Sequence, residues 1–155
     1  MLQKQIILLL LLLLSSCGYE AIHSKKNAAN YDFSVSELSF VGDRTVNLKI
    51  KEKLNNYAQD KKNKDFILKI SSTSKKTTIA KNTAGDATSF KNSISINIEV
   101  LMNNKFKSNL IILESFNYNN VSNKFNLKKY EVEIKNNLAE AATEKLIFKL
   151  SNIQW

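Results

Sequence analysis

The chain has 155 residues, enough for one domain with a single core, and a formal net charge of +9, with lysine at every basic position except Arg44. One cysteine and one histidine exclude an intramolecular disulfide and the usual zinc sites. The positive charge favours an anionic membrane surface or a phosphorylated glycolipid as partner. Nucleic acid is not expected, because proteins that read it rely on arginine.

The N-terminal segment predicts export and lipidation. Lys4 precedes an unbroken run of isoleucine and leucine over residues 6–14, which suits a signal peptide and is too short to span a bilayer. The run ends in Leu14-Ser15-Ser16-Cys17, which matches a bacterial lipobox. We therefore expect residues 1–16 to be a signal peptide and Cys17 to carry a diacylglycerol and an N-acyl chain. An ordinary cleaved signal with a chance cysteine is the alternative.

The residues after Cys17 indicate the location and a tether. Gly18 occupies the position where many bacterial lipoproteins have an inner-membrane retention Asp, so the predicted location is the periplasmic side of the outer membrane. Residues 17–30 are polar and irregular and suit a lipidated tether, and this segment contains His23, the only imidazole. Residues 31–155 are expected to form a single domain.

The first half of that domain is predicted to contain a strand, a helix and further strands. Apolar residues alternate from Phe33 to Phe40 with a change of parity near Glu37, which predicts a strand with a bulge. Asp43 is a good N-cap for a helix that extends to about Gln59. An apolar stripe supports this helix: Val46, Ile50, Leu54 and Tyr57.

A charged turn at residues 60–64 leads into a predicted strand over Phe66–Ile70. Residues 72–76 are turn-like, and residues 77–80 could begin a third strand that is interrupted around residues 82–86, where Gly85 permits an unusual backbone conformation.

The second half has the clearest periodicity. Residues 90–102 alternate strictly and predict a long half-buried strand; Asn103-Asn104 predicts a tight turn, and residues 106–118 return as a hairpin partner. After a loop, Asn126 is a candidate cap for a helix from Leu127 to about Asn152. The order predicts an α+β fold with two helices on one face of a roughly four-stranded, mostly antiparallel sheet.

The chemistry-bearing residues do not suggest an enzyme. No nucleophile motif, phosphate-binding glycine loop or metal-ligand cluster occurs, so neither a catalytic site nor a metal or other cofactor beyond the covalent lipid is expected. The glutamates of the second helix alternate with lysines, as on a solvated face with local ion pairs. A hydrolase that uses carboxylates would need a paired-carboxylate pocket.

Two sets of residues are candidates for binding. Lysine ammonium groups near a predicted turn could contact lipid phosphates, or they could be edge-strand lysines that prevent aggregation: Lys75, Lys76, Lys81 and Lys91. Ile111 and Leu113 are apolar on the opposite parity from Leu110 and Ile112. They are either part of a strand buried on both faces or a contact surface for a partner protein.

An ordered set of local strings resembles the family of LptE, the lipopolysaccharide-assembly lipoprotein that partners the LptD barrel. The set covers nearly the whole chain after the signal: Cys17-Gly18-Tyr19, Gly42-Asp43-Arg44, Leu54, the strand at 66–70, the turn and strand start at 82–90, Ser115-Phe116-Asn117-Tyr118, and Ala139, Ala141 and Ala142 of the last helix.

The resemblance implies a nonenzymatic role. Such proteins sit in the lumen of the LptD-type β-barrel as a plug, assist its assembly, and bind lipopolysaccharide on its way to the outer leaflet. On this interpretation Ile111 and Leu113 are candidate barrel contacts, and the four lysines are candidate phosphate ligands. The alternative is a stand-alone lipoprotein on the periplasmic face that binds anionic lipid or a cell-wall polymer.

Overall fold

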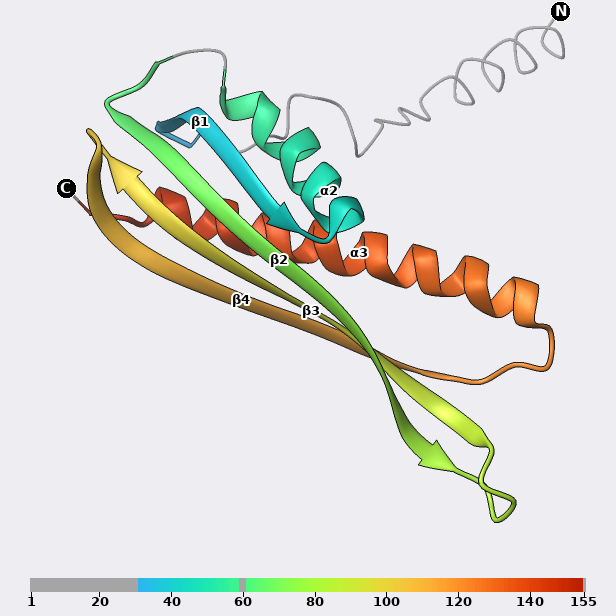
Figure 1. The fold of residues 1–155 in the computed structure, drawn as a ribbon. Helices are drawn as coiled ribbons and strands as arrows, with labels where there is room; N and C mark the ends of the chain where they lie inside the picture. Colours follow the sequence, from blue (N-terminus) through green and yellow to red (C-terminus); the bar gives the residue numbers. More distant parts are fainter. Residues whose placement is uncertain (1–30, 59–60, 155) are drawn as a thin grey trace, which may run out of the picture. The chain divides into compact units, whose positions relative to one another are not determined.

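The computed structural model describes residues 31–58 and 61–154 (Figure 1). The predicted signal peptide, the tether, Cys17 and His23 lie outside the described residues. The elements follow in the order β1 (Phe33–Gly42), α2 (Arg44–Leu54), the 3-10 turn η3 (Asn55–Tyr57), β2 (Lys64–Lys81), β3 (Ala87–Met102), β4 (Lys105–Asn119) and α3 (Lys124–Ser151).

The strands of the described residues form one mixed sheet in the order β1-β2-β3-β4. The β1–β2 pair is parallel, because α2 crosses over between them, and the other two pairs are antiparallel. The residues that face α2 and α3 are buried and those on the other side of the strands are mostly exposed, so both helices cover the same face. The predicted α+β class is confirmed.

The structure of β1 and the start of α2 agrees with the predictions from the sequence. A register shift between Val35 and Glu37 places the predicted bulge, and the Asp43 carboxylate accepts hydrogen bonds from the backbone N–H groups of Thr45 (3.0 Å) and Val46 (3.1 Å). Gly42, with a φ of 100°, makes the sharp turn between strand and helix.

The predicted extension of this helix to about residue 59 is wrong, because α2 ends at Leu54 and continues as a single 3-10 turn. Asn55 and Asn56 are weak helix formers. The tighter turn brings the Tyr57 ring onto Phe33, with ring centroids 4.7 Å apart, so tertiary packing favours the earlier end.

The predicted turn at residues 72–76 is also wrong, because β2 is one continuous strand from Lys64 to Lys81. Ser72 and Ser74 donate hydrogen bonds to the start of α2: the Ser72 hydroxyl to the Asn47 side-chain oxygen (2.7 Å) and the Ser74 hydroxyl to the Asp43 carboxylate (2.5 Å). These partners satisfy the hydrogen-bonding hydroxyl groups of Ser72 and Ser74 on the helix-covered face. The two serines can therefore be part of a continuous strand.

The turn at Asn103-Asn104 is as predicted, whereas residues 82–86, predicted as an interruption within a strand, form the hairpin turn between β2 and β3. Residues 82–86 join β2 to β3 with Gly85 at a φ of 88°, and Asn103-Asn104 joins β3 to β4 with φ values of 54° and 59°. Helix α3 begins a turn earlier than predicted. Asn123 is its N-cap and accepts from the N–H of Asn126, so Asn126 lies inside the helix.

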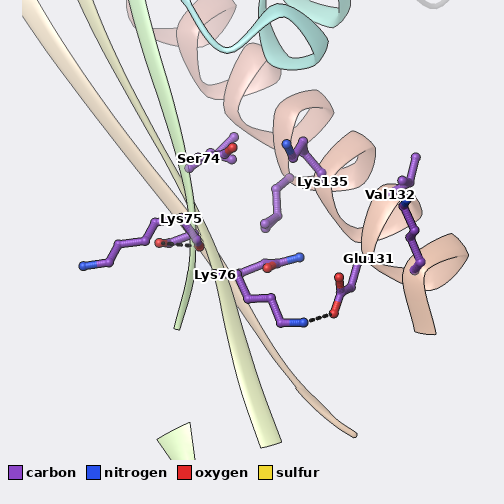
Figure 2. Close-up of a pocket in the computed structure, with 11 residues that line it drawn as sticks. Ser74, Lys75, Lys76, Glu131, Val132 and Lys135 are labelled. Atoms are coloured by element: carbon purple, nitrogen blue, oxygen red, sulfur yellow. Dashed lines mark hydrogen bonds and ion pairs between the residues drawn. The ribbon is translucent and has the colours of Figure 1, made fainter. Parts of the chain in front are cut away.

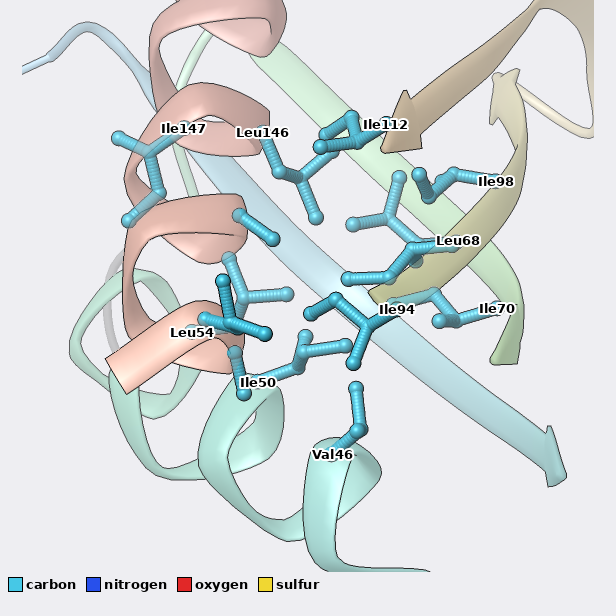
Figure 3. Close-up of a cluster of buried hydrophobic side chains, with 14 of the residues drawn as sticks. Val46, Ile50, Leu54, Leu68, Ile70, Ile94, Ile98, Ile112, Leu146 and Ile147 are labelled. Carbon is cyan, nitrogen blue, oxygen red and sulfur yellow. The ribbon is translucent and has the colours of Figure 1, made fainter. Parts of the chain in front are cut away.

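One hydrophobic cluster lies between the sheet and the helices (Figure 3). Helix α2 contributes Val46, Ile50 and Leu54, and α3 contributes Leu146 and Leu150, all with no exposed surface. Every member of this cluster lies within residues 33–150, and residues 31–155 form a compact unit of their own.

Candidate lipid-binding and partner-binding surfaces

Two of the four candidate lysines, Lys75 and Lys91, lie on the uncovered face of the sheet. Lys75 on β2 pairs with Ser93 on β3, and Lys91 pairs with Thr77, so the two lysines are diagonal neighbours on adjacent strands. Both are exposed. Together they present two ammonium groups on one surface, an arrangement that suits a phosphate group on a lipid.

Lys76 lies on the opposite face of the sheet from Lys75. Figure 2 shows the two side chains pointing to opposite sides of β2, because successive residues of a strand alternate between faces. The Lys76 ammonium is 2.5 Å from the Glu131 carboxylate of α3 and 3.9 Å from the centre of the Phe90 ring. Its charge is therefore already matched within the chain.

Lys81 ends β2 beside the 82–86 turn and is exposed. The four lysines thus do not form one site: Lys75 and Lys91 share a face, Lys76 faces α3, and Lys81 lies at the hairpin tip. The expectation that Lys75-Lys76 lies at a hairpin turn is wrong, since both are inside β2. The strand conformation separates these two sequence neighbours.

A cleft of about 250 Å³ lies between β2, β3 and the first half of α3 (Figure 2). Ile94 and Leu138 are among its apolar lining residues. The Tyr118 hydroxyl donates to Glu131 (2.9 Å); burial first, and then this acidic partner, raises the pKa of Tyr118. The hydroxyl consequently remains a proton donor to Glu131.

Asp43 contacts two of the residues that line this cleft, Ser74 and Lys135. Its carboxylate is 3.0 Å from the Lys135 ammonium and accepts the hydrogen bond from Ser74. Burial raises the pKa of Asp43, but the hydrogen bonds from Ser74, Lys135 and Val46 outweigh it and lower the pKa to about 2. Lys76 and Lys135 are both paired here, whereas Lys128, which also lines the cleft, forms no ion pair with another described residue.

Ile111 and Leu113 project from β4 on the uncovered face, where their side chains are 60% and 69% exposed. Their partners on β3 are Asn97 and Ser95, whereas Ile112 faces the helices and is buried. Of the two alternatives, burial on both faces is therefore wrong. With Phe106, which is 65% exposed on the same face, they form an apolar column along the edge strand β4 that is interrupted by Asn109.

The sequence prediction missed one group of exposed residues, at the start of α3. Phe125 is 78% exposed and is flanked by Lys124, Lys128 and Lys129. A helix that starts at Leu127 does not place these positions on a common helical face. Asn123, three residues before Asn126, is also a good N-cap residue, and a helix that begins after Asn123 would have placed Lys124 and Phe125 on α3.

Within the described residues, no group of His, Cys, Asp and Glu side chains is placed to hold a metal ion. Among the same residues, no helix is both long and apolar enough to cross a membrane.

This fold, a parallel β1–β2 pair extended by an antiparallel hairpin under two helices, occurs in solved structures of small bacterial lipoproteins. Rare lipoprotein B from Shewanella oneidensis has a TM-score of 0.58 at 14% identity, over 74% of this chain and 93% of that chain. An uncharacterized lipoprotein B from Nitrosomonas europaea gives 0.60 at 12% identity, over 79% and 87%. A minor lipoprotein from Acinetobacter baumannii gives 0.56 at 10% identity, over 75% and 90%.

The chain therefore has the fold of the rare lipoprotein B, or LptE-like, structures, which confirms the fold that the resemblance implied. No family model matches the sequence, and no curated protein matches it.

Proposed function

We propose that this protein is an outer-membrane lipoprotein without enzymatic activity, held on the periplasmic side by acyl chains on Cys17. The lipobox at the end of residues 1–16 supports this assignment, as does a fold shared with proteins that are themselves called lipoproteins. Two or more acyl chains on one cysteine would make the attachment stable.

Its proposed role is that of a plug in an LptD-type β-barrel, which assists assembly of the barrel and binds lipopolysaccharide during transport. The observation that carries this proposal is the uncovered face of the sheet. It combines the apolar column of Phe106, Ile111 and Leu113 with the ammonium groups of Lys75 and Lys91. The apolar column suits a protein wall, and the lysines suit lipid phosphates.

The partner is tested by crosslinking in the cell envelope followed by affinity purification of the lipoprotein. The native protein should recover an outer-membrane barrel of LptD type, and the pair Ile111→Asp with Leu113→Asp should reduce the yield strongly. Leu48→Asp is the matched control, because Leu48 is 55% exposed on α2, away from this face. Native protein that recovers no such barrel would contradict the plug proposal.

The lipid role is tested by binding of purified lipopolysaccharide. Lys75→Glu with Lys91→Glu should weaken binding by about tenfold or more for each charge-assisted hydrogen bond that the substitutions remove. Lys51→Glu with Lys149→Glu is the control, since both lysines are exposed on the helices. Equal binding by the two double variants would assign Lys75 and Lys91 to solubility and edge protection instead.

A second candidate function is that of a stand-alone lipoprotein that binds anionic lipid or a cell-wall polymer. The excess of positive charge, with Lys75 and Lys91 exposed on the uncovered face, favours it. Lipopolysaccharide binding that depends on Lys75 and Lys91, without any barrel in the crosslinked complex, would support this second function.

A further inference from the structure

The first half of α3 carries an apolar stripe that faces away from the core. Phe125 and Val132 are seven residues apart and so lie on one side of the helix; they are 78% and 52% exposed. Leu127 and Ile134, also seven residues apart, are buried on the core side. Another seven residues after Val132, Ala139 is fully buried, so the uncovered stripe is confined to the start of α3.

Three exposed lysines flank this stripe on the same side of the helix. Lys124 and Lys128 are one turn apart, and Lys129 is one turn after Phe125. None of the three forms an ion pair with another described residue, in contrast to Lys76 and Lys135 nearby. Their positive charges are therefore available to an external partner.

Lys124, the first residue of α3, is in an unfavourable place for helix stability. The N-terminal end of a helix is the positive end of its macrodipole, where acidic residues stabilise and basic residues destabilise. The first turn of α3 contains no acidic residue. A lysine in this position, together with an exposed phenylalanine, opposes folding stability in two ways, which points to selection for binding rather than for the fold.

The stripe is held in place by the hairpin beside it. The backbone N–H of Asn120 donates to the Thr88 carbonyl oxygen (2.8 Å), and its side-chain amide donates to the Ala87 carbonyl oxygen (2.7 Å). Lys124 donates to the Asn120 side-chain oxygen (3.1 Å). Figure 1 shows the start of α3 toward the same end of the sheet as the β2–β3 turn.

We propose that this basic apolar stripe (Lys124, Phe125, Lys128, Lys129 and Val132) docks on the surface of an anionic glycerophospholipid bilayer. Phe125 and Val132 enter the boundary between headgroups and acyl chains, and the three lysines contact the phosphates on either side. The charge complementarity selects this partner: aromatic or aliphatic residues flanked by unpaired lysines on one helix face are the composition of interfacial membrane helices. The inference does not depend on the barrel proposal.

The direct test measures binding to vesicles that contain no lipopolysaccharide. Residues 17–155 with Cys17→Ser lack the anchor but keep the whole described core, and they are mixed with vesicles of phosphatidylglycerol and phosphatidylcholine, or of phosphatidylcholine alone. The protein should float with the anionic vesicles and not with the neutral ones, and added salt should release it. Absence of binding to the anionic vesicles, or equal binding to both, would overturn the proposal.

Substitutions then locate the surface. Phe125→Ser should lower the partition coefficient about tenfold, because less apolar surface is buried in the membrane. Lys128→Glu with Lys129→Glu should lower it by about 25-fold or more. Phe148→Ser with Lys149→Glu is the matched control at the other end of α3, where Phe148 is 61% exposed, and it should leave binding unchanged. A larger loss in this control than in the stripe variants would overturn the assignment.

Two measurements separate docking from unfolding. Lys128→Glu with Lys129→Glu changes only exposed side chains, so its melting temperature should stay within about 4 °C of that of the wild type while vesicle binding falls. Phe125→Trp, in a background with Trp155→Phe, should shift its emission to the blue with anionic vesicles. An unchanged emission spectrum in the presence of bound vesicles would place Phe125 outside the membrane and refute its role.

Discussion

Asp43 is a residue whose energetic contribution can be predicted from the structure in some detail. Its carboxylate caps α2 through the N–H groups of Thr45 and Val46, pairs with Lys135 on α3, and accepts a hydrogen bond from Ser74 on β2. Three elements thus meet at one side chain that is 17% exposed. Replacing Asp43 with asparagine distinguishes the contribution of the helix cap from that of the charge, because asparagine caps a helix about as well as aspartate but carries no charge.

The magnitude follows from two contributions. Loss of an N-cap costs about 1 kcal/mol. The fall of the Asp43 pKa from 3.8 to about 2 corresponds to about 2.4 kcal/mol of preference for the charged form, which partial exposure of Lys135 reduces to about 1–2 kcal/mol. We therefore expect Asp43→Ala to lower the free energy of unfolding by about 2–3 kcal/mol and Asp43→Asn by about 1–2 kcal/mol.

The assay is urea unfolding followed by circular dichroism at several pH values, with Glu52→Ala as control. Glu52 lies on the same helix with its side chain 68% exposed, and its pair with Lys49 should contribute less than about 0.5 kcal/mol. Since the pKa of Asp43 is lower in the folded state, its contribution is present above about pH 4 and is lost as the pH falls through 2. The difference between wild type and Asp43→Asn should shrink over that range.

Two results would refute this reasoning. One is an equal loss of stability in Asp43→Ala and Glu52→Ala, which would mean that the buried contacts of Asp43 contribute no more than a surface charge. The other is a difference between wild type and Asp43→Asn that stays constant between about pH 5 and pH 2, because the charge of Asp43 would then not be the source of the effect.

Further predictions concern the turns and the core. A Cβ on Gly42 would lie 1.9 Å from the Ser72 carbonyl oxygen at a φ of 100°, so Gly42→Ala should lower the free energy of unfolding by about 3 kcal/mol or more. Gly85→Ala, at a φ of 88° in open space, should cost only about 1 kcal/mol, and similar melting temperatures for the two variants would contradict this. Leu146→Ala, at a fully buried site, should cost about 2–5 kcal/mol, whereas Phe148→Ala at an exposed site should cost less than about 0.5 kcal/mol; chemical denaturation distinguishes these outcomes.

The sequence predicts features that depend on neighbouring residues. The Asp43 cap, the bulge before Glu37 and the turn at Asn103-Asn104 each depend on the conformational preferences of a few consecutive residues. The alternation along β3 reveals which of its residues face the core. These predictions are confirmed because local backbone chemistry and tertiary packing favour the same conformation there.

The predictions fail where distant residues decide the outcome. Local propensity favours a turn at Ser72 and Ser74. Their hydrogen-bond partners at the start of α2 are 25 and 31 positions away, so these contacts cannot be inferred from neighbouring residues. A turn there would also group Lys75 with Lys76. Once β2 is continuous, alternation puts the two lysines on opposite faces.

By itself, then, the sequence determined the class of fold and the order of its elements, because hydrophobic periodicity records which side of each strand and helix meets the core. It also supplied the residue types of the candidate surfaces. Tertiary structure alone decided which of these residues are exposed and unpaired, and so are available to bind a partner. Both helices cover one face of the sheet, so Ile111 and Leu113 stay exposed, Glu131 neutralises Lys76, and Phe125 lies on a stripe of α3 that no other described element covers.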